Sequence, residues 1–414
     1  MKHKWIIATI LIAAEIMIGA LIVASVTAPI SQPGFQFRFF QYDTVPAESD
    51  EEQRIPIGDA THLSVSNLRG QIAIASAPGD AIIVRAHKRA WSNTVANAQA
   101  ALAQLDVNIA QTNDTIEITR LTEEPWRPGI ASMRRSPTVA LTITVPATMA
   151  VTARLDVGDV TLADITGNVD LRTNVGAVSV KNVVGDLQLY ANTGNITIAN
   201  TLAGALNART SNGAIHLANV RVARDAIAQT SNGDIELNAG GAGMFTARTA
   251  YGKITLRDLI VRDTIIASSD AGNVNLERVQ SASCDLQTAR GNIAIDDIAG
   301  ALKIRTDSGT VDVKNARQVS LTAQTARGAI TFAGSLGAGP HTLESDHGNI
   351  SLSLPQDSAL AFDVQTDRGE IKSELPLALT HDLKSRQRGT LNNGGASLTI
   401  NAHNGNIALT SLNP

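Results

Sequence analysis

Carboxyl groups are the side chains of this 414-residue chain that could most directly carry out catalysis. A glycan-cleaving β-helix enzyme needs clustered carboxylates, with or without calcium, and an Arg or Lys base on the same face. The outward carboxylates here are separated along the sequence and occupy different positions of a repeat, so we predict solvated surface and no catalytic residue. These carboxylates are Asp159, Asp170, Asp234, Glu236, Asp285 and Asp312.

Motifs for metal ions, nucleophiles and nucleotides are also missing from the sequence. The eight histidines show no metal-ligand spacing, and the GGAG at 240–243 does not extend into a calcium-binding nonapeptide repeat. Neither a Gly-x-Ser-x-Gly elbow nor a phosphate-binding glycine loop occurs in a suitable strand–helix setting. The single cysteine, Cys284, falls in an inward position, which predicts a buried core residue rather than a reactive thiol. We therefore expect no metal and no cofactor.

One polar column could bind a ligand. Four residues before each repeated glycine stands an outward residue that is often Arg or Gln, which predicts a stripe along the molecule. Stacked arginines repel one another, and intervening Gln or Ser residues relieve this, so a purely structural role is the competing interpretation. The binding interpretation is a linear track for an anionic or glycan polymer. Its residues are Arg154, Arg172, Tyr190, Arg209, Arg248 and Arg305.

These residues are positioned by a repeat of about nineteen residues, seen in TSNGAIHL (210–217), TAYGKITL (249–256) and TARGNIAI (288–295). Each copy has a Thr, two variable residues, a Gly and an apolar–polar–apolar triplet. A period of this size held over many copies indicates a solenoid. The glycines are Gly158, Gly176, Gly194, Gly213, Gly233, Gly252, Gly272, Gly291, Gly309, Gly328, Gly348, Gly369 and Gly405.

Alternating apolar positions flank each of these glycines. The second and fourth residues after it are apolar, as in Ile254 and Leu256, and so are the seventh and fifth before it, as in Phe245 and Ala247. Period-two alternation rich in β-branched residues predicts half-buried strands, and the glycine predicts positive φ or a tight corner. The predicted fold is all-β: a β-solenoid, or parallel β-helix, with coils of about 18–20 residues.

The N-terminus predicts a membrane anchor. Residues 5–26 are predominantly apolar and carry one charge, Glu15, and about 22 residues at 1.5 Å each span a bilayer core. Lys2 and Lys4 precede this segment, so we expect a single-pass signal anchor with a cytoplasmic N-terminus and the solenoid outside the cell. A cleaved signal peptide is the competing interpretation. The net charge of −4 gives no reason to expect a nucleic-acid partner.

The remaining organisation follows from shifts in pattern along the chain. Residues 1–27 are the predicted anchor, and residues 28–60 are a predicted spacer with several prolines and an alternating aromatic patch at 35–42. Residues 61–150 are predicted to be the β-rich N-terminal part of the solenoid, including a short helix at 93–105 capped by Ser92 or Asn93. Regular repeats occupy 151–374, and 375–414 form an irregular C-terminal coil and cap.

The combination of SNLRGQIAI (66–74), AHKRA (86–90), TITVPA (142–147), the serial T-x-x-G units and NGNIAL (404–409) resembles the bacterial DUF4097 family, a family of candidate adhesins. The resemblance covers roughly residues 60–411. It implies an envelope-associated β-solenoid with adhesion assigned by analogy, and it implies no catalytic or ligand residues.

The function expected from these observations is that of a membrane-anchored, extracytoplasmic binding or structural module of the cell envelope, without catalytic activity. Its partners would be the membrane, through the N-terminal helix, and a cell-wall glycan or an envelope protein. Two alternatives remain open: a carbohydrate-active enzyme on a β-helix, and a self-assembling envelope scaffold.

Overall fold

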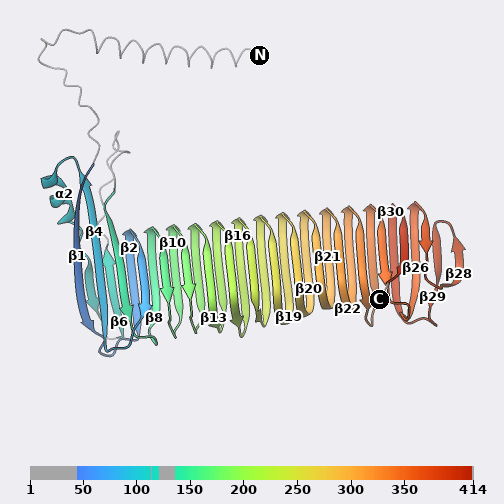
Figure 1. Ribbon diagram of the computed structural model, residues 1–414, viewed down its shortest axis with the longest axis horizontal. Helices are drawn as coiled ribbons and strands as arrows, with labels where there is room; N and C mark the ends of the chain where they lie inside the picture. The colour runs from blue at the N-terminus through green and yellow to red at the C-terminus, as the bar shows by residue number, and fades with distance from the viewer. Residues whose placement is uncertain (1–43, 113, 121–135, 413–414) are drawn as a thin grey trace, which may run out of the picture. The chain divides into compact units, whose positions relative to one another are not determined.

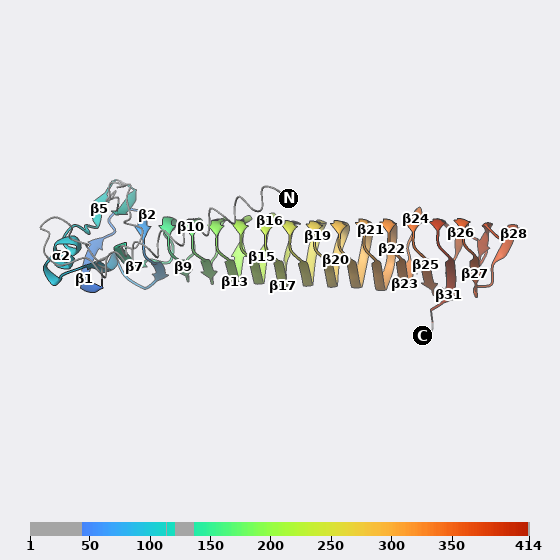
Figure 2. The ribbon, with the colours of Figure 1, turned by 90° about the horizontal axis from the view of Figure 1, so that it is seen from above.

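The computed structural model describes residues 44–112, 114–120 and 136–412. Within these residues the chain is an all-β solenoid with coils of about nineteen residues, and nearly all its strands pair in parallel with the strand one coil away. Figures 1 and 2 show these strands side by side from β8 to β26. The predicted fold is therefore confirmed for the described part.

The first part of the described chain contains the one helix and the strands that lead into the regular repeat. Its elements are β1 (Val45–Pro56), β2 (His62–Arg69), β3 (Ile72–Ser76), β4 (Ala81–Ser92), α2 (Val95–Leu102), β5 (Asn108–Gln111), β6 (Thr115–Arg120), β7 (Thr138–Val145), β8 (Ala150–Val157) and β9 (Val160–Ala163).

In the regular region each coil has a strand before its corner glycine and a strand after it, and from β19 to β22 the strand continues around the coil. The strands are β10 (Val169–Val175), β11 (Val178–Lys181), β12 (Leu187–Thr193), β13 (Ile196–Ala203), β14 (Leu206–Asn212), β15 (Ile215–Val222), β16 (Asp225–Asn232), β17 (Ile235–Ala242), β18 (Met244–Tyr251), β19 (Ile254–Ala271), β20 (Val274–Arg290), β21 (Ile293–Ser308) and β22 (Val311–Arg327).

The C-terminal part continues the coils and adds an antiparallel hairpin. Its strands are β23 (Ile330–Leu336), β24 (His341–His347), β25 (Ile350–Leu354), β26 (Leu360–Arg368), β27 (Ile371–Ser373), β28 (Ala378–Leu383), β29 (Arg386–Leu391), β30 (Ala396–Asn404) and β31 (Ile407–Ser411).

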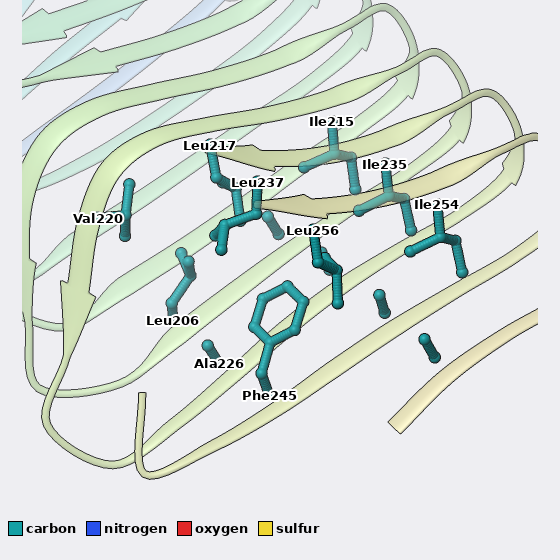
Figure 3. Packing of buried hydrophobic residues seen from close by; sticks show 14 of the residues in the cluster. Leu206, Ile215, Leu217, Val220, Ala226, Ile235, Leu237, Phe245, Ile254 and Leu256 are labelled. Carbon is teal, nitrogen blue, oxygen red and sulfur yellow. The ribbon is translucent and has the colours of Figure 1, made fainter. Parts of the chain in front are cut away.

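The core runs inside the coils as columns of stacked apolar side chains. Ile215, Ile235 and Ile254 pair in register and are fully buried. Figure 3 shows this column facing the side chains that precede the corner glycines, with Phe245 next to the smaller Ala226. Large and small neighbours in one column fill the interior at the density that protein cores require. Each coil thus buries its apolar face only against its neighbours.

The corner glycines are required by close stacking of the backbone. A Cβ atom on Gly194 would lie 1.8 Å from the carbonyl oxygen of Gly176, and the same clash recurs along the corner. The φ angle of Gly194 is also +150°, a backbone conformation that residues other than glycine rarely adopt. The predicted corner is confirmed, and the dominant physical reason is the approach of one coil's backbone to the next.

The Thr of the repeated T-x-x-G unit has a structural role that the sequence pattern alone did not reveal. The Thr288 hydroxyl donates to the carbonyl oxygen of Gly272 in the preceding coil, at 2.9 Å, and the side chain is buried. Thr249 and Thr325 do the same toward Gly233 and Gly309. Buried polar groups are stable only when they are hydrogen-bonded, and this ladder meets that requirement.

A second corner, six residues after the glycine, uses a left-handed residue in the nine successive coils from Asp164 to Asn315. Asn182 has φ +54° and Asn219 has φ +53°, and most other coils place Asn or Asp there. These residue types tolerate the left-handed region because their short polar side chains bond locally. The Asn182 Nδ2 atom donates to Asp164 Oδ1 in the preceding coil at 2.8 Å. A polar ladder therefore runs along this edge.

Both ends of the solenoid depart from sequence order. At the N-terminal end, β2 lies between β6 and β8, and β3 lies between β7 and β9, so the first coil is enclosed by later segments. At the C-terminal end, β30 lies between β24 and β26, and β31 lies between β25 and β27. The last coil is thus inserted between two earlier coils, whereas the sequence suggested that it simply ends the stack.

Antiparallel strands cover the two ends. β1 pairs with β4, which pairs with β7, and α2 packs on β1 and β4. At the other end β29 pairs antiparallel with β26, and β28 pairs with β29. The acidic residues of β1 are matched across the pair, as in Glu52 with Arg85 at 2.7 Å.

Several predicted boundaries change. The helix predicted at 93–105 is α2, Val95–Leu102, and its N-cap is Thr94, whose hydroxyl accepts from the Asn97 N–H, rather than Ser92 or Asn93. Val95, placed on the apolar face by its spacing, is 58% exposed. Part of the predicted spacer, 45–56, forms strand β1 because its alternating residues pair with β4.

The predicted membrane anchor at 5–26 and the aromatic patch at 35–42 lie outside the described residues. Within the part that the structure describes, no helix is both long and apolar enough to cross a bilayer.

Candidate functional site

The predicted stripe lies on the strands that precede the corner glycines, and the parallel register brings its members together one coil at a time. Arg154 of β8 pairs with Arg172 of β10, which pairs with Tyr190 of β12, and Tyr190 pairs with Arg209 of β14. The even offset of four residues from the glycine points each of these side chains outward, and all are exposed. The first four predicted residues thus form one continuous row.

The rest of the stripe is interrupted by neutral residues. Gln229 separates Arg209 from Arg248, and Ser268 and Gln287 separate Arg248 from Arg305. Arg305 lies 3.9 Å from Asp307 and is therefore partly neutralised.

A hollow of about 390 Å³ lies at the basic end of the stripe. It contains three of the six predicted residues and two polar residues from the adjoining column, Asp156 and Asn174, whose side chains are joined by a 2.5 Å hydrogen bond. We call it the stripe hollow. It is lined by Ser66, Asn67, Arg154, Leu155, Asp156, Arg172, Thr173, Asn174 and Tyr190.

The charges of the stripe hollow are only partly balanced. Arg172 donates two hydrogen bonds to Asp170, at 2.9 and 3.0 Å, and this contact raises the pKa of its guanidinium. Arg154, directly beside it in the ladder, has no hydrogen-bonding or ion-pair partner among the described residues. Like charges directly opposite on paired strands are unfavourable. An anionic group placed between the two guanidinium groups would relieve this repulsion.

The face as a whole is polarised along the solenoid. From β8 to β18 its outward positions carry four arginines against two carboxylates, counting the three outward positions of each of these strands. At the other end, β24, β30 and β26 carry carboxylates and a histidine in the same positions. The outward charged residues are Arg154, Arg172, Arg209, Arg248, Asp156 and Asp170 at the first end, and Glu344, Asp346, His403, Asp363 and Asp367 at the second.

The carboxylates singled out from the sequence do not converge on one groove. Asp170 binds Arg172, Asp285 binds Lys303 at 3.1 Å, and Asp312 lies 2.8 Å from Lys314. Asp159 and Asp234 each accept the backbone N–H of the next coil. These contacts give each of these five carboxylates a structural role.

Only Glu236 joins a larger cluster, which the sequence did not reveal. Arg257 bridges Glu236 and Glu277, at 3.2 and 3.0 Å, and Arg278 binds Asp258 as well as Glu277. Hydrogen bonds from Arg278 lower the pKa of both Asp258 and Glu277. A general acid for glycoside cleavage needs a raised pKa, so this cluster is suited to linking coils and not to proton transfer.

Cys284 is buried, as its inward position predicted. Desolvation raises the pKa of its thiol to about 11, an effect that the hydrogen bond with the Ser281 hydroxyl opposes. A thiol in this state is a poor nucleophile.

Two solved structures show similarity at low sequence identity. One is a candidate cell adhesion protein from Clostridium sporogenes ATCC 15579, which is 10% identical, with 88% of this chain and all of that chain covered and a TM-score of 0.19. The other is a candidate adhesin from Bacteroides fragilis NCTC 9343, which is 15% identical, with 60% of this chain and 96% of that chain covered and a TM-score of 0.38. A search of curated proteins gave no match.

The family comparison agrees with the resemblance noted in the sequence. Two overlapping segments, 70–256 and 242–410, match the model of the family described as Toastrack DUF4097. Together they run from the first corner glycine, Gly70, through the regular repeats to the inserted last coil. Because these segments span most of the chain, the protein belongs to the Toastrack DUF4097 family.

Proposed function

We propose that this protein is a non-catalytic binding module of the cell envelope, anchored by residues 5–26, whose stripe hollow binds an anionic glycan. The observation that carries the proposal is the row Arg154, Arg172 and Tyr190 above one hollow on a rigid ladder.

The chemistry of the row suits an acidic sugar. A guanidinium group binds a carboxylate, sulfate or phosphate through two parallel hydrogen bonds. Tyr190, with 40% of its surface exposed, offers an apolar ring face for a sugar ring and a hydroxyl for a hydrogen bond. Asp156 and Asn174 add polar groups for sugar hydroxyls.

The ladder also suits a polymer rather than a single sugar. Coils repeat at about 4.8 Å, the spacing of adjacent strands, so equivalent groups recur at a constant distance. Arg209 and Arg248 continue the row beyond the hollow. A chain of acidic sugars that crosses the strands from coil to coil would meet further arginines at Arg209 and Arg248.

A direct test uses the full-length chain in a neutral detergent, titrated with a uronic-acid polymer and with neutral dextran in the presence of EDTA. We expect binding to the acidic polymer only, weakening as salt rises because exposed charges are screened. The double variant Arg154→Gln/Arg172→Gln should lose at least about tenfold in affinity, roughly 1.4 kcal/mol.

The matched control is Arg221→Gln, which removes an exposed arginine from another column, on β15. Its affinity should equal that of the unchanged protein. The proposal fails when the acidic polymer does not bind, or when Arg221→Gln weakens binding as much as the double variant.

A further inference from the structure

The acidic end of the polarised face holds a group of side chains that the glycan proposal does not use. Glu344 and Asp346 lie on β24, His403 lies on β30 and Asp367 lies on β26. These strands are successive neighbours only because the last coil is inserted between the other two. Residues separated by up to 59 positions in the sequence therefore share one small area.

The imidazole of His403 links the three coils. Its Nδ1 atom lies 2.8 Å from Asp367 Oδ2, and its Nε2 atom lies 3.8 Å from Asp346 Oδ1. Glu344, Asp346 and His403 each present one ligand atom within 4.8 Å of the other two. When Nδ1–H donates to Asp367, the lone pair is on Nε2, the atom that lies 3.8 Å from Asp346 Oδ1.

This arrangement matches a metal site in which a histidine and two carboxylates bind the ion and a further carboxylate orients the histidine. Histidines that bind metals usually donate their second ring N–H to a carboxylate, which fixes the tautomer and the ring orientation. An imidazole nitrogen with two carboxylate oxygens is a donor set for Zn²⁺ and related ions, leaving positions for water. A shallow hollow of about 170 Å³, lined by Arg305 of an earlier coil, lies beside two of the three side chains, Glu344 and Asp346.

The charge balance separates this group from the other carboxylate cluster. Around Asp258 and Glu277, arginines match the carboxylates. At the acidic end, Glu344 accepts only from the neutral Gln324, at 3.0 Å, and Asp346 has no Lys or Arg partner among the described residues. Within the described residues, His403 is the histidine whose ligand atom lies within 4.8 Å of both carboxylates.

We propose that Glu344, Asp346 and His403 bind a divalent transition metal ion of the Zn²⁺ type, with Asp367 positioning the imidazole. The bound ion joins β24 to the inserted strand β30 and, through Asp367, to β26. It therefore fastens the last coil at the place where the chain departs from sequence order. The glycan proposal is independent of this site.

The test measures Zn²⁺ binding to the tag-free, full-length chain after EDTA treatment and dialysis, by isothermal titration calorimetry. We expect one equivalent to bind. His403→Gln and Asp346→Asn, made separately, should each weaken binding by more than about tenfold. Asp367→Asn should weaken it by about tenfold, because Asp367 orients the histidine and does not itself bind the ion. Ca²⁺ should bind far more weakly than Zn²⁺, because an imidazole ligand disfavours hard cations.

The control is His381→Gln, an exposed histidine on β28 outside the group, which should bind Zn²⁺ normally. Thermal unfolding provides a second readout: saturating Zn²⁺ should raise the Tm of the unchanged protein and of the control, because binding to the folded state stabilises it, and should leave that of His403→Gln unchanged. The proposal is overturned by absence of Zn²⁺ binding, by undiminished binding in both His403→Gln and Asp346→Asn, or by equal affinity for Ca²⁺.

Discussion

Single residues in this solenoid act mainly by repeating one contact in most coils. Before most corner glycines a buried Thr hydroxyl donates to the glycine carbonyl of the neighbouring coil, and Ser269 and Ser345 substitute for Thr in two coils. Ala191 lies between Thr173 and Thr210 in the same column without a hydroxyl. The contact is therefore repeated widely without being obligatory in each coil.

Thr288→Val tests the value of this contact. The substitution keeps the shape of the side chain but removes the donor to Gly272, so we expect a loss of about 1–2 kcal/mol in the free energy of unfolding. Thr197→Val on β13 is the matched control, because Thr197 is exposed and should change stability by less than about 0.5 kcal/mol. Urea denaturation of both variants measures the difference, and equal effects would refute the role of the ladder.

His341 predicts a dependence of stability on pH. Burial lowers the pKa of this imidazole, against the opposing effect of its hydrogen bond to the Gly337 carbonyl, and its Nδ1 atom accepts the Leu321 N–H at 3.2 Å. As pH falls below about 6.5, the unfolded state takes up a proton before the folded state does. Stability is then lost between the unfolded pKa and the lower folded pKa, and it is constant above both.

Replacing His341 by Leu should remove this part of the pH dependence. We expect the free energy of unfolding to fall less steeply between pH 7.5 and pH 5 than in the unchanged protein. The exposed His381→Gln variant should retain the original slope. Parallel slopes for the unchanged protein and His341→Leu would show that His341 takes up protons equally in both states, which would contradict a lowered pKa in the folded state.

At the scale of the element, each regular coil has two corners, and the two place different demands on the backbone. The glycine corner allows close stacking, and the second corner needs a left-handed residue. Ala239, with φ +59°, is unusual at the second corner, where Asn219 precedes it and Asp258 follows it in the neighbouring coils. A side chain with a Cβ atom and no local hydrogen bond is strained in this region by about 1–2 kcal/mol.

Ala239→Asn should therefore stabilise the protein. We expect a gain of about 0.5–1 kcal/mol, because Asn tolerates the left-handed region and extends the polar ladder. Ala239→Gly separates the two causes, since glycine relieves the strain without adding an amide. Thermal melting of both variants measures the effect, and a fall in Tm for both would contradict the explanation.

At the scale of the whole molecule, the two ends protect the stack by enclosing a coil. An ordinary solenoid frays from its terminal coils, which have one unpaired side. Here β30 has a parallel partner on each side, whereas β28 is paired on one side only and each of its residues is exposed to solvent. The chain's last coil is therefore interior, and the hairpin before it is the true edge.

Hydrogen exchange tests whether β30 is more protected than the edge strand β28. Amides of Leu398–Ala402 should exchange at least about tenfold more slowly than those of Ala378–Leu383, a difference of roughly 1.4 kcal/mol in opening free energy. Amides of Leu286–Thr288 in β20 provide the reference for an undisturbed coil. Faster exchange in β30 than in β28 would show that the chain end frays despite its position.

Much of the fold follows from the sequence because the repeat is local. Strand alternation decides which side chain points inward, and an equal spacing places equivalent residues in neighbouring coils. For this reason Ile254, Phe245, Cys284 and the corner glycines could be placed correctly, and the row from Arg154 to Arg209 could be identified. The helix was less well determined, since Val95 fits an amphipathic spacing and yet remains exposed.

The tertiary structure alone decided which coils are neighbours at the ends. Every coil presents the same apolar pattern and the same backbone ladder, so the sequence does not distinguish stacking β30 on β26 from inserting it beside β24. The approach of His403 to Asp346 depends on that choice, and so does the enclosure of the first coil. The sequence by itself therefore determined the coil, because its contacts are periodic. Only the folded chain determined the order of the terminal coils, because each of them could pair with several strand edges that present nearly the same pattern.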